Sequence, residues 1–211
     1  MLLAVDSLLR GDAAAAPSSR RCLQLGMTGC AFAGIALGIT SGDLRMALFA
    51  AIKVPLLLVF TAALCLPSFF VVNTLLGLRD DFAAVCRALL AAQAVAGIAL
   101  GAASPMLVFL GISVLDPYLL TLLDAVQFAL AATAAQMVLA RHYQPLIARD
   151  RRHVLALRGW LALFAFTGVQ LAWVLRPFRG TAGFPVQFLR PEAFEQNAYV
   201  VLFEHLLRLG A

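Results

Sequence analysis

Four polar side chains that could do chemistry lie inside otherwise apolar stretches of the chain. Lys53 and Asp124 each lie about two helical turns from the same end of their segments. Gln127 follows Asp124 by one turn, and Gln170 belongs to nearly the same layer. A charge near the centre of a bilayer costs about 2.5 to 3.5 kcal/mol on insertion scales. We therefore predict an ion pair between Lys53 and Asp124.

This intramembrane polar cluster has three interpretations. It could bind a cation, a proton or a small solute. It could instead be a hydrogen-bonded clamp that fixes the register of the helices. Lys53 could also extend its amine outward to the head groups without entering the cluster.

A second polar layer is expected nearer the opposite end of the same segments. Its members are three amides in three apolar segments: Asn73, Gln93 and Gln136. Two polar layers on shared helices predict one bundle interior.

The usual catalytic and metal-binding patterns do not occur in the sequence. The histidines His142, His153 and His205 are far apart, and the four cysteines, Cys22, Cys30, Cys65 and Cys86, include no Cys-x-x-Cys pair. No zinc-protease, nucleophile-elbow, phosphate-loop or dinucleotide motif is present. We expect no catalytic residue, no metal site and no cofactor, and we expect that the protein is not an enzyme.

Five long apolar segments must position these side chains. Hydrophobic residues make up 63% of the chain and charged residues only 13%, which no soluble core could absorb. A hydrocarbon layer of about 30 Å needs roughly 20 apolar residues in a helix. The segments near Cys22–Thr40, Ala47–Leu76, Phe82–Ser113, Tyr118–Ala140 and Leu155–Leu175 meet this need. The predicted fold is an all-α, polytopic transmembrane helical bundle with about five spans.

The second and third segments are longer than a bilayer requires, which indicates tilt, kinking or protrusion. Pro55 and Pro67 in the second segment and Pro105 in the third each remove a backbone hydrogen bond. These two segments are therefore expected to be bent or broken.

Small residues recur at helical spacing on three of the segments. Such stripes let membrane helices approach closely, because lipid gives no hydrophobic drive for association. Packing within the chain is the favoured interpretation and dimerisation is the alternative. The stripes consist of Gly26, Cys30, Gly34 and Gly38, of Gly97 and Gly101, and of Ala125, Ala129 and Thr133.

The spans divide the chain into three parts. Residues 1–21 form an N-terminal segment in which Asp6 and Arg10 lie on one side of a short amphipathic helix. Residues 22–175 form the five-span bundle. Residues 176–211 are expected to form a loop followed by an amphipathic helix, from about Pro191 to Leu209, that lies at the membrane interface or, as the alternative, docks another protein. A single folded unit is expected.

The basic residues predict the orientation of the chain. The net charge is +5, and most arginines fall on the side of the N-terminus and the even-numbered connections. The positive-inside rule then places the N-terminus in the cytoplasm and the C-terminus outside. Arg149, Arg151 and Arg152 are expected to contact anionic lipid head groups, with an acidic cytosolic protein as the alternative partner. Nucleic acid is not expected as a partner.

The sequence predicts a class of protein more readily than a function. We expect a non-enzymatic anchor, scaffold or assembly subunit of a larger complex, with membrane lipids and other membrane subunits as partners. The alternatives are a small-solute or ion transporter that uses the cluster around Lys53 and Asp124, and a lipid-handling enzyme. The preference for arginine over lysine and the heavy use of alanine fit a GC-rich bacterial genome, and the expected location is the cell inner membrane.

Overall fold

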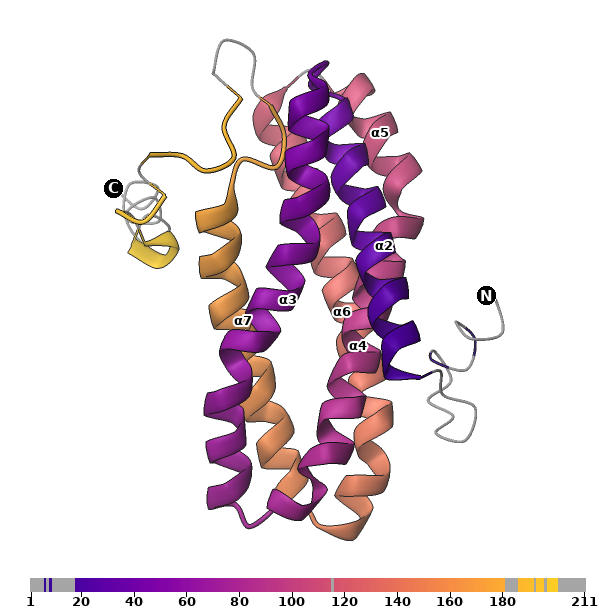
Figure 1. Cartoon of the computed structure of the whole chain (residues 1–211), viewed down its shortest axis with the longest axis vertical. Helices are drawn as coiled ribbons and strands as arrows, with labels where there is room; N and C mark the ends of the chain where they lie inside the picture. The colour runs from indigo at the N-terminus through magenta and orange to yellow at the C-terminus, as the bar shows by residue number, and fades with distance from the viewer. Residues whose placement is uncertain are drawn as a thin grey trace.

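A computed structural model shows a bundle of long helices that run roughly along one axis (Figure 1). It describes residues 6, 8, 18–114, 116–180, 186–191, 193–195 and 197–200. Within these residues the regular elements are all helical: α2 (Ser19–Ile39), α3 (Leu44–Leu75), the short 3-10 helix η1 (Arg79–Asp81), α4 (Phe82–Ala102), α5 (Ser104–Ser113), α6 (Pro117–Arg149) and α7 (Arg152–Leu175).

Five of these helical segments are long and apolar enough to cross a membrane. They correspond to α2, α3, η1 with α4, α6 and α7, and the shorter α5 continues the third span after a break. The predicted all-α bundle with five apolar spans is therefore confirmed.

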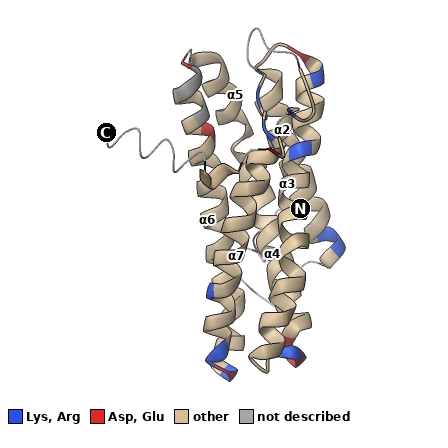
Figure 2. Cartoon of the chain, turned by 90° about the vertical axis from the view of Figure 1, so that its left-hand side faces the viewer, with Lys and Arg blue, Asp and Glu red and all other residues tan. Residues whose placement is uncertain are grey.

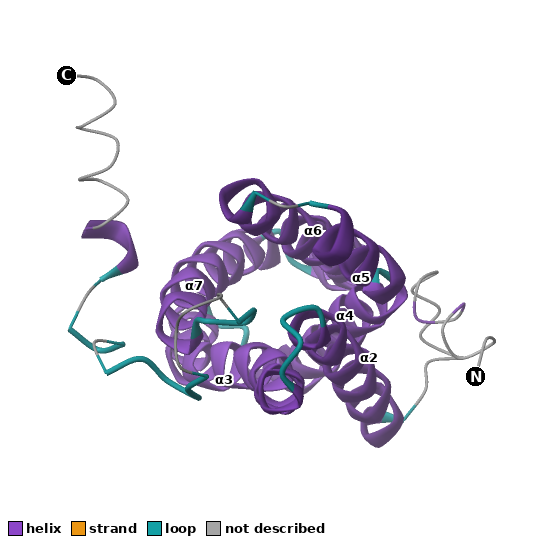
Figure 3. Cartoon of the chain, turned by 90° about the horizontal axis from the view of Figure 1, so that it is seen from above, coloured by secondary structure: helices purple, strands orange, loops and turns teal. Residues whose placement is uncertain are grey.

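The helices are arranged around a ring. α2 packs against α3 on one side and α4 on the other, α4 packs against α6, and α3 packs against α7. Seen along the axis, α7, α3, α2, α4 and α6 follow one another around the bundle (Figure 3). We call the end where α2 leads into α3 the upper end, as it is drawn in Figure 1, and the end where α6 leads into α7 the lower end.

The lower half holds the largest buried cluster. Trp160 of α7 lies 5.0 Å from Phe69 of α3 between ring centroids, and Tyr143 of α6 and Leu89 of α4 are buried in the same cluster. This packing explains why α6 is longer than its apolar stretch. The sequence predicted an end near Ala140, where the hydropathy falls, but the helix continues to Arg149 because Tyr143 and Leu146 are buried beyond that point.

The prolines act differently in the two long segments. α3 contains Pro55 and Pro67 but remains one α-helix of 32 residues. The third segment breaks at Ala103, two residues before Pro105. Ser104 donates a hydrogen bond to the Leu100 carbonyl at this break, and proline near glycine or serine is a common cause of such a kink.

The predicted small-residue stripes of α2 and α4 lie at helix contacts. A Cβ atom added to Gly97 would overlap the backbone of Gly26, and one added to Gly101 would overlap Gly29. Gly34 and Gly38 lie equally close to Ala50 and Ala47 of α3. The backbone of α2 thus approaches both neighbours, and Gly29 is a contact residue that the predicted stripe omitted.

The terminal helices are described only in part. The predicted amphipathic helix in residues 1–21 lies largely outside the described residues, although Leu8 is buried in a cluster with Cys22, Ala91 and Val138. Of the predicted helix Pro191–Leu209, residues 198–200 are helical and 201–211 lie outside the described part.

The close approach of α2 and α4 yields a test of this packing. Gly97→Ala should lower the free energy of unfolding by about 1–3 kcal/mol, because the added methyl group overlaps backbone that has nowhere to move. Thermal unfolding in detergent measures the effect. Gly159→Ala in α7 is the control, since a Cβ atom there meets open space and alanine is the better helix former. Equal midpoints for the two variants would contradict the tight contact.

Candidate functional site

Lys53 and Asp124 do not pair with each other. Lys53 is fully buried in α3, and its Nζ donates a hydrogen bond of 2.7 Å to the carbonyl oxygen of Pro177. The ammonium group also lies 5.2 Å from the centre of the Phe188 ring, within the range of a cation–π contact. The predicted ion pair is therefore wrong, and so is the interpretation that Lys53 extends outward.

The partner of Asp124 is Arg179, which follows α7 in the chain. The guanidinium donates to both carboxylate oxygens, with the Nη2–Oδ1 distance at 2.8 Å, and both side chains are largely buried. Paired donors suit a carboxylate, so the contact is a bidentate charge-assisted hydrogen bond.

The remaining donors of Arg179 reach two other elements. Nη1 donates to the Thr40 hydroxyl and the Leu37 carbonyl at the end of α2, and Nη2 donates to the Leu107 carbonyl of α5. Gly111 of α5 makes room for the guanidinium, because a Cβ atom there would clash with it. One side chain thus joins α2, α5 and α6, which satisfies the buried charge and its donors together.

The segment that contains Arg179 closes the upper end of the bundle. We call Arg176–Gly180 the plug segment. Its Phe178 ring lies 6.2 Å from the Phe128 ring of α6 and packs against a buried cluster to which α2, α3, α4, α5 and α6 all contribute. Gly180 lies against Ser41 in the turn between α2 and α3. Lys53 and Asp124 are therefore bound by two different residues of the plug segment, Pro177 and Arg179.

Arg179 was missed because sequence reasoning placed it in a surface loop. It occupies the stretch after the last span, where an arginine ordinarily faces water or head groups. The signal that could have found it is Asp124 itself. A buried carboxylate needs a cation, and a planar guanidinium with five donors meets that need better than an ammonium group.

The two glutamines of the predicted cluster have separate environments. The Gln170 side-chain oxygen accepts a hydrogen bond of 3.0 Å from the backbone of Ala198, and Tyr199 donates to the Phe166 carbonyl nearby. These contacts hold Ala198 and Tyr199 against α7. Gln170 thus serves the C-terminal segment, and within the described residues it forms no hydrogen bond with Lys53 or Asp124.

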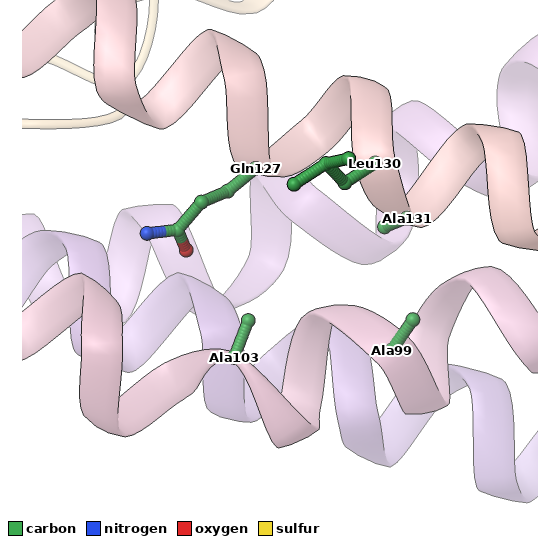
Figure 4. A pocket seen from close by; sticks show the side chains of 5 residues that line it. All are labelled: Ala99, Ala103, Gln127, Leu130 and Ala131. Atoms are coloured by element: carbon green, nitrogen blue, oxygen red, sulfur yellow. The ribbon is translucent and has the colours of Figure 1, made fainter.

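Gln127 faces a small cavity beside the break in the third span. The cavity measures about 170 Å³ and is lined by Gln127, Leu130 and Ala131 of α6 with Ala99 and Ala103. Figure 4 shows the amide group directed across this space towards Ala103. Both polar atoms of the amide are buried without a hydrogen-bond partner among the described residues, so Gln127 is a polar group of the cluster that could still accept a ligand or a water molecule.

The three amides predicted as a second layer do not share one level. Asn73 donates to the Phe69 carbonyl of its own helix, close to the turn at the lower end. Gln93 lies about 16 Å along α4 from Phe82, at about 1.5 Å per residue. The side-chain oxygens of Asn73, Gln93 and Gln136 are all buried without a partner among the described residues.

Ion pairs connect the two turns of the lower end. Asp81 lies 3.4 Å from Arg149 and 3.1 Å from the fully buried His153. Arg152 binds Asp150 and donates to the Leu76 carbonyl. The hydrogen bond from the Arg152 side chain is the main reason that the pKa of Asp150 lies below its usual value. Two of the three arginines that were expected to contact lipid, Arg149 and Arg152, thus have carboxylate partners, and Arg151 is exposed.

No metal-binding group is found in the described part of the chain. No three His, Cys, Asp or Glu side chains there gather closely enough to hold a metal ion, and the four cysteines are unbridged. Comparison with protein-family models, with curated proteins and with solved structures found no match for this chain.

The pairing of Asp124 can be tested by exchange of charged for apolar residues. Asp124→Leu and Arg179→Met should each lower the free energy of unfolding by about 3 kcal/mol or more, because each leaves a buried charge without its partner. The double variant should regain most of that loss. Thermal unfolding of the purified protein in detergent gives the three values for a double-mutant cycle.

A second double variant separates this pairing from the one that the sequence predicted. Lys53→Met combined with Asp124→Leu should be no more stable than Asp124→Leu alone, because Lys53 binds a carbonyl and not the carboxylate. Recovery of stability in the Lys53 double variant, and not in the Arg179 one, would show that the arrangement described above is wrong.

Proposed function

We propose that this chain is a non-enzymatic integral membrane protein that anchors, scaffolds or assembles a larger membrane complex. The main support for the proposal is that the buried charges of Lys53 and Asp124 both have partners within the chain. Lys53 and Asp124 are both bound by the plug segment of the same chain, so neither is left to bind a transported ion. Buried ionisable groups in a transporter instead line a path that water can reach.

An unpartnered stripe on α6 supports a role in assembly. The stripes of α2 and α4 are used inside the bundle, but Ala125, Ala129 and Thr133 are exposed on the outer side of α6. The Thr133 hydroxyl donates to the Ala129 carbonyl of its own turn, which leaves a smooth surface. Small residues in line are what close packing of another membrane helix requires.

The distribution of charge supports the orientation within a bacterial inner membrane. Figure 2 shows charged residues gathered towards the ends, with few in between. The larger group of arginines lies in the lower half, so we assign the lower end and the N-terminus to the cytoplasm and the upper end and the C-terminus to the outside. The described arginines of the lower half are Arg20, Arg21, Arg79, Arg87, Arg141, Arg149, Arg151, Arg152 and Arg158.

The alternative function, a small-solute or ion transporter, is favoured by one observation. The unpartnered amide of Gln127 lies at a break in a membrane helix, and broken helices form the binding sites of many transporters. The cavity beside it is small and mostly apolar, and the plug segment binds the neighbouring Asp124. These two features favour scaffolding over transport. A transporter would let water reach Gln127, whereas a scaffold would not.

A photo-crosslinking amino acid at position 129 tests the assembly role. In cells, the probe should give discrete adducts with another membrane protein, because the small-residue stripe is expected to hold a partner helix. The control is the same probe at Val169, an exposed residue of α7 outside the stripe. Adducts are resolved by electrophoresis and identified by mass spectrometry. Equal, diffuse labelling at both positions would count against a partner at α6.

Thiol labelling tests whether water reaches the polar site. A charged, membrane-impermeant thiol reagent should not modify Gln127→Cys in sealed vesicles when it is added from the upper side, because the plug segment closes that end. Ser113→Cys, exposed at the end of α5, should react and so prove access of the reagent. Both substitutions are made in a parent without the four native cysteines. Rapid labelling of Gln127→Cys would favour the transporter.

A further inference from the structure

Exposed arginines surround the bundle about two helical turns inside its lower end. Arg87, Arg141 and Arg158 lie about 8, 12 and 9 Å from the lower ends of α4, α6 and α7, at about 1.5 Å per residue. All three side chains are exposed. Together with Arg20 and Arg21 at the start of α2, we call these residues the arginine belt.

Packing contacts bring the members of the belt to similar heights. Cys22, which follows Arg21, is buried in one cluster with Ala91 of α4 and Val138 of α6. Arg87 lies one turn below Ala91, and Arg141 lies one turn below Val138. The side chain of arginine is long enough to cover the remaining difference in height, because its charged group can extend away from an apolar stem.

The contacts of Arg179 give a reference level near the upper end. Its guanidinium binds Thr40, Leu107 and Asp124, so these residues of three different helices lie close to one level. From that level to the belt, the chain runs from Thr40 back to Arg21, from Leu107 back to Arg87 and from Asp124 on to Arg141.

These three paths have nearly equal lengths. At about 1.5 Å per residue they measure about 28, 30 and 26 Å along the chain, and the path from Leu107 to Arg87 crosses the break at Ala103. The hydrocarbon core of a bilayer is about 30 Å thick. Three separate spans therefore give similar thicknesses for one slab, which extends from the plug segment to the arginine belt.

We propose that the arginine belt binds the phosphate groups of anionic lipids and marks the lower face of the hydrocarbon core, so that the helix ends below it extend into water. Within the described residues, Arg20, Arg21, Arg87 and Arg158 have no carboxylate partner, and α4 and α7 contain no acidic residue. Cations at this position attract anionic head groups.

The helix ends below the belt have a different charge pattern. Asp80, Asp81 and Asp150 lie there, and Arg149 and Arg152 bind two of them. Carboxylates would be repelled from an anionic lipid surface, whereas they are solvated in water. The belt, and not the trio Arg149, Arg151 and Arg152, is therefore the surface that contacts lipid phosphate.

Paired substitutions distinguish the belt from the helix ends. In nanodiscs, replacing phosphatidylcholine with phosphatidylglycerol should raise the unfolding temperature of the native protein. Arg87→Gln with Arg158→Gln should weaken phosphatidylglycerol binding about tenfold or more, since each arginine near an anionic surface contributes about 1 kcal/mol. Arg79→Gln with Arg151→Gln removes the same charge below the belt and should leave binding nearly unchanged.

The readouts also identify the source of the phosphate. Native mass spectrometry counts bound phosphatidylglycerol, and inorganic phosphate added to the protein in detergent should not reproduce the stabilisation. A larger loss from the Arg79 and Arg151 pair, or equal losses from both pairs, would overturn the proposal. Stabilisation by inorganic phosphate alone would show a free-anion site instead of a lipid site.

The level of the lower membrane face can be measured independently on α3, which carries no arginine of the belt. Thr74→Cys and Phe60→Cys both place a thiol on an exposed face, the first below the level of the belt and the second above it. In vesicles open to reagent on both sides, an impermeant thiol reagent should modify position 74 and not position 60. Protection of both would mean that lipid covers α3 to its lower end, which would overturn the proposed boundary.

Discussion

The packing of the upper half of the bundle depends on the contacts of one guanidinium group, that of Arg179. Arg179 lies among acceptors from α2, α5 and α6, and its charge is neutralised by Asp124. If the arginine were absent, the carboxylate would be left in a site with little water, and the three helices would lose a common hydrogen-bonding partner. The same segment also supplies the carbonyl that Lys53 binds, so the two buried charges of opposite sign are satisfied two residues apart. The plug segment therefore both closes the upper end of the bundle and binds its two buried charges.

The lipid environment explains how the helices of the bundle pack against one another. Apolar burial gives little reason for helices to associate in a bilayer, so close backbone contact must supply the attraction. α2 meets this condition twice, with glycines facing α4 and α3. In the lower half the packing uses larger side chains, such as Trp160, two residues from Arg158 of the belt, and Phe69. The chain thus uses two kinds of packing along one axis.

The number of spans, their approximate positions and most of the contact glycines of α2 and α4 could be predicted from the sequence, because hydropathy and helical spacing report directly on lipid contact and close approach. The end of α6 could not, because hydropathy marks where lipid ends and not where the helix ends. The need of Asp124 for a cation was also predictable, but its identity was not. Lys53 was predicted as the partner because it lies at a similar depth in its helix. The observed partner, Arg179, belongs to a segment after α7 whose path no local sequence pattern predicts. Pro55 and Pro67 did not break α3, while Pro105 follows a break, so a proline alone did not decide the outcome.

The position of the plug segment in the chain has a consequence for biogenesis. A ribosome synthesises Thr40 and Asp124 well before Arg179, and domains form in that order during synthesis. The first hairpin and the fourth span must therefore wait in the membrane with an uncompensated carboxylate until the last span has been inserted. A chain that stalls before residue 179 would therefore leave the Asp124 carboxylate without the guanidinium that pairs with it in the finished molecule, and the end of α2 without the same hydrogen-bond donor.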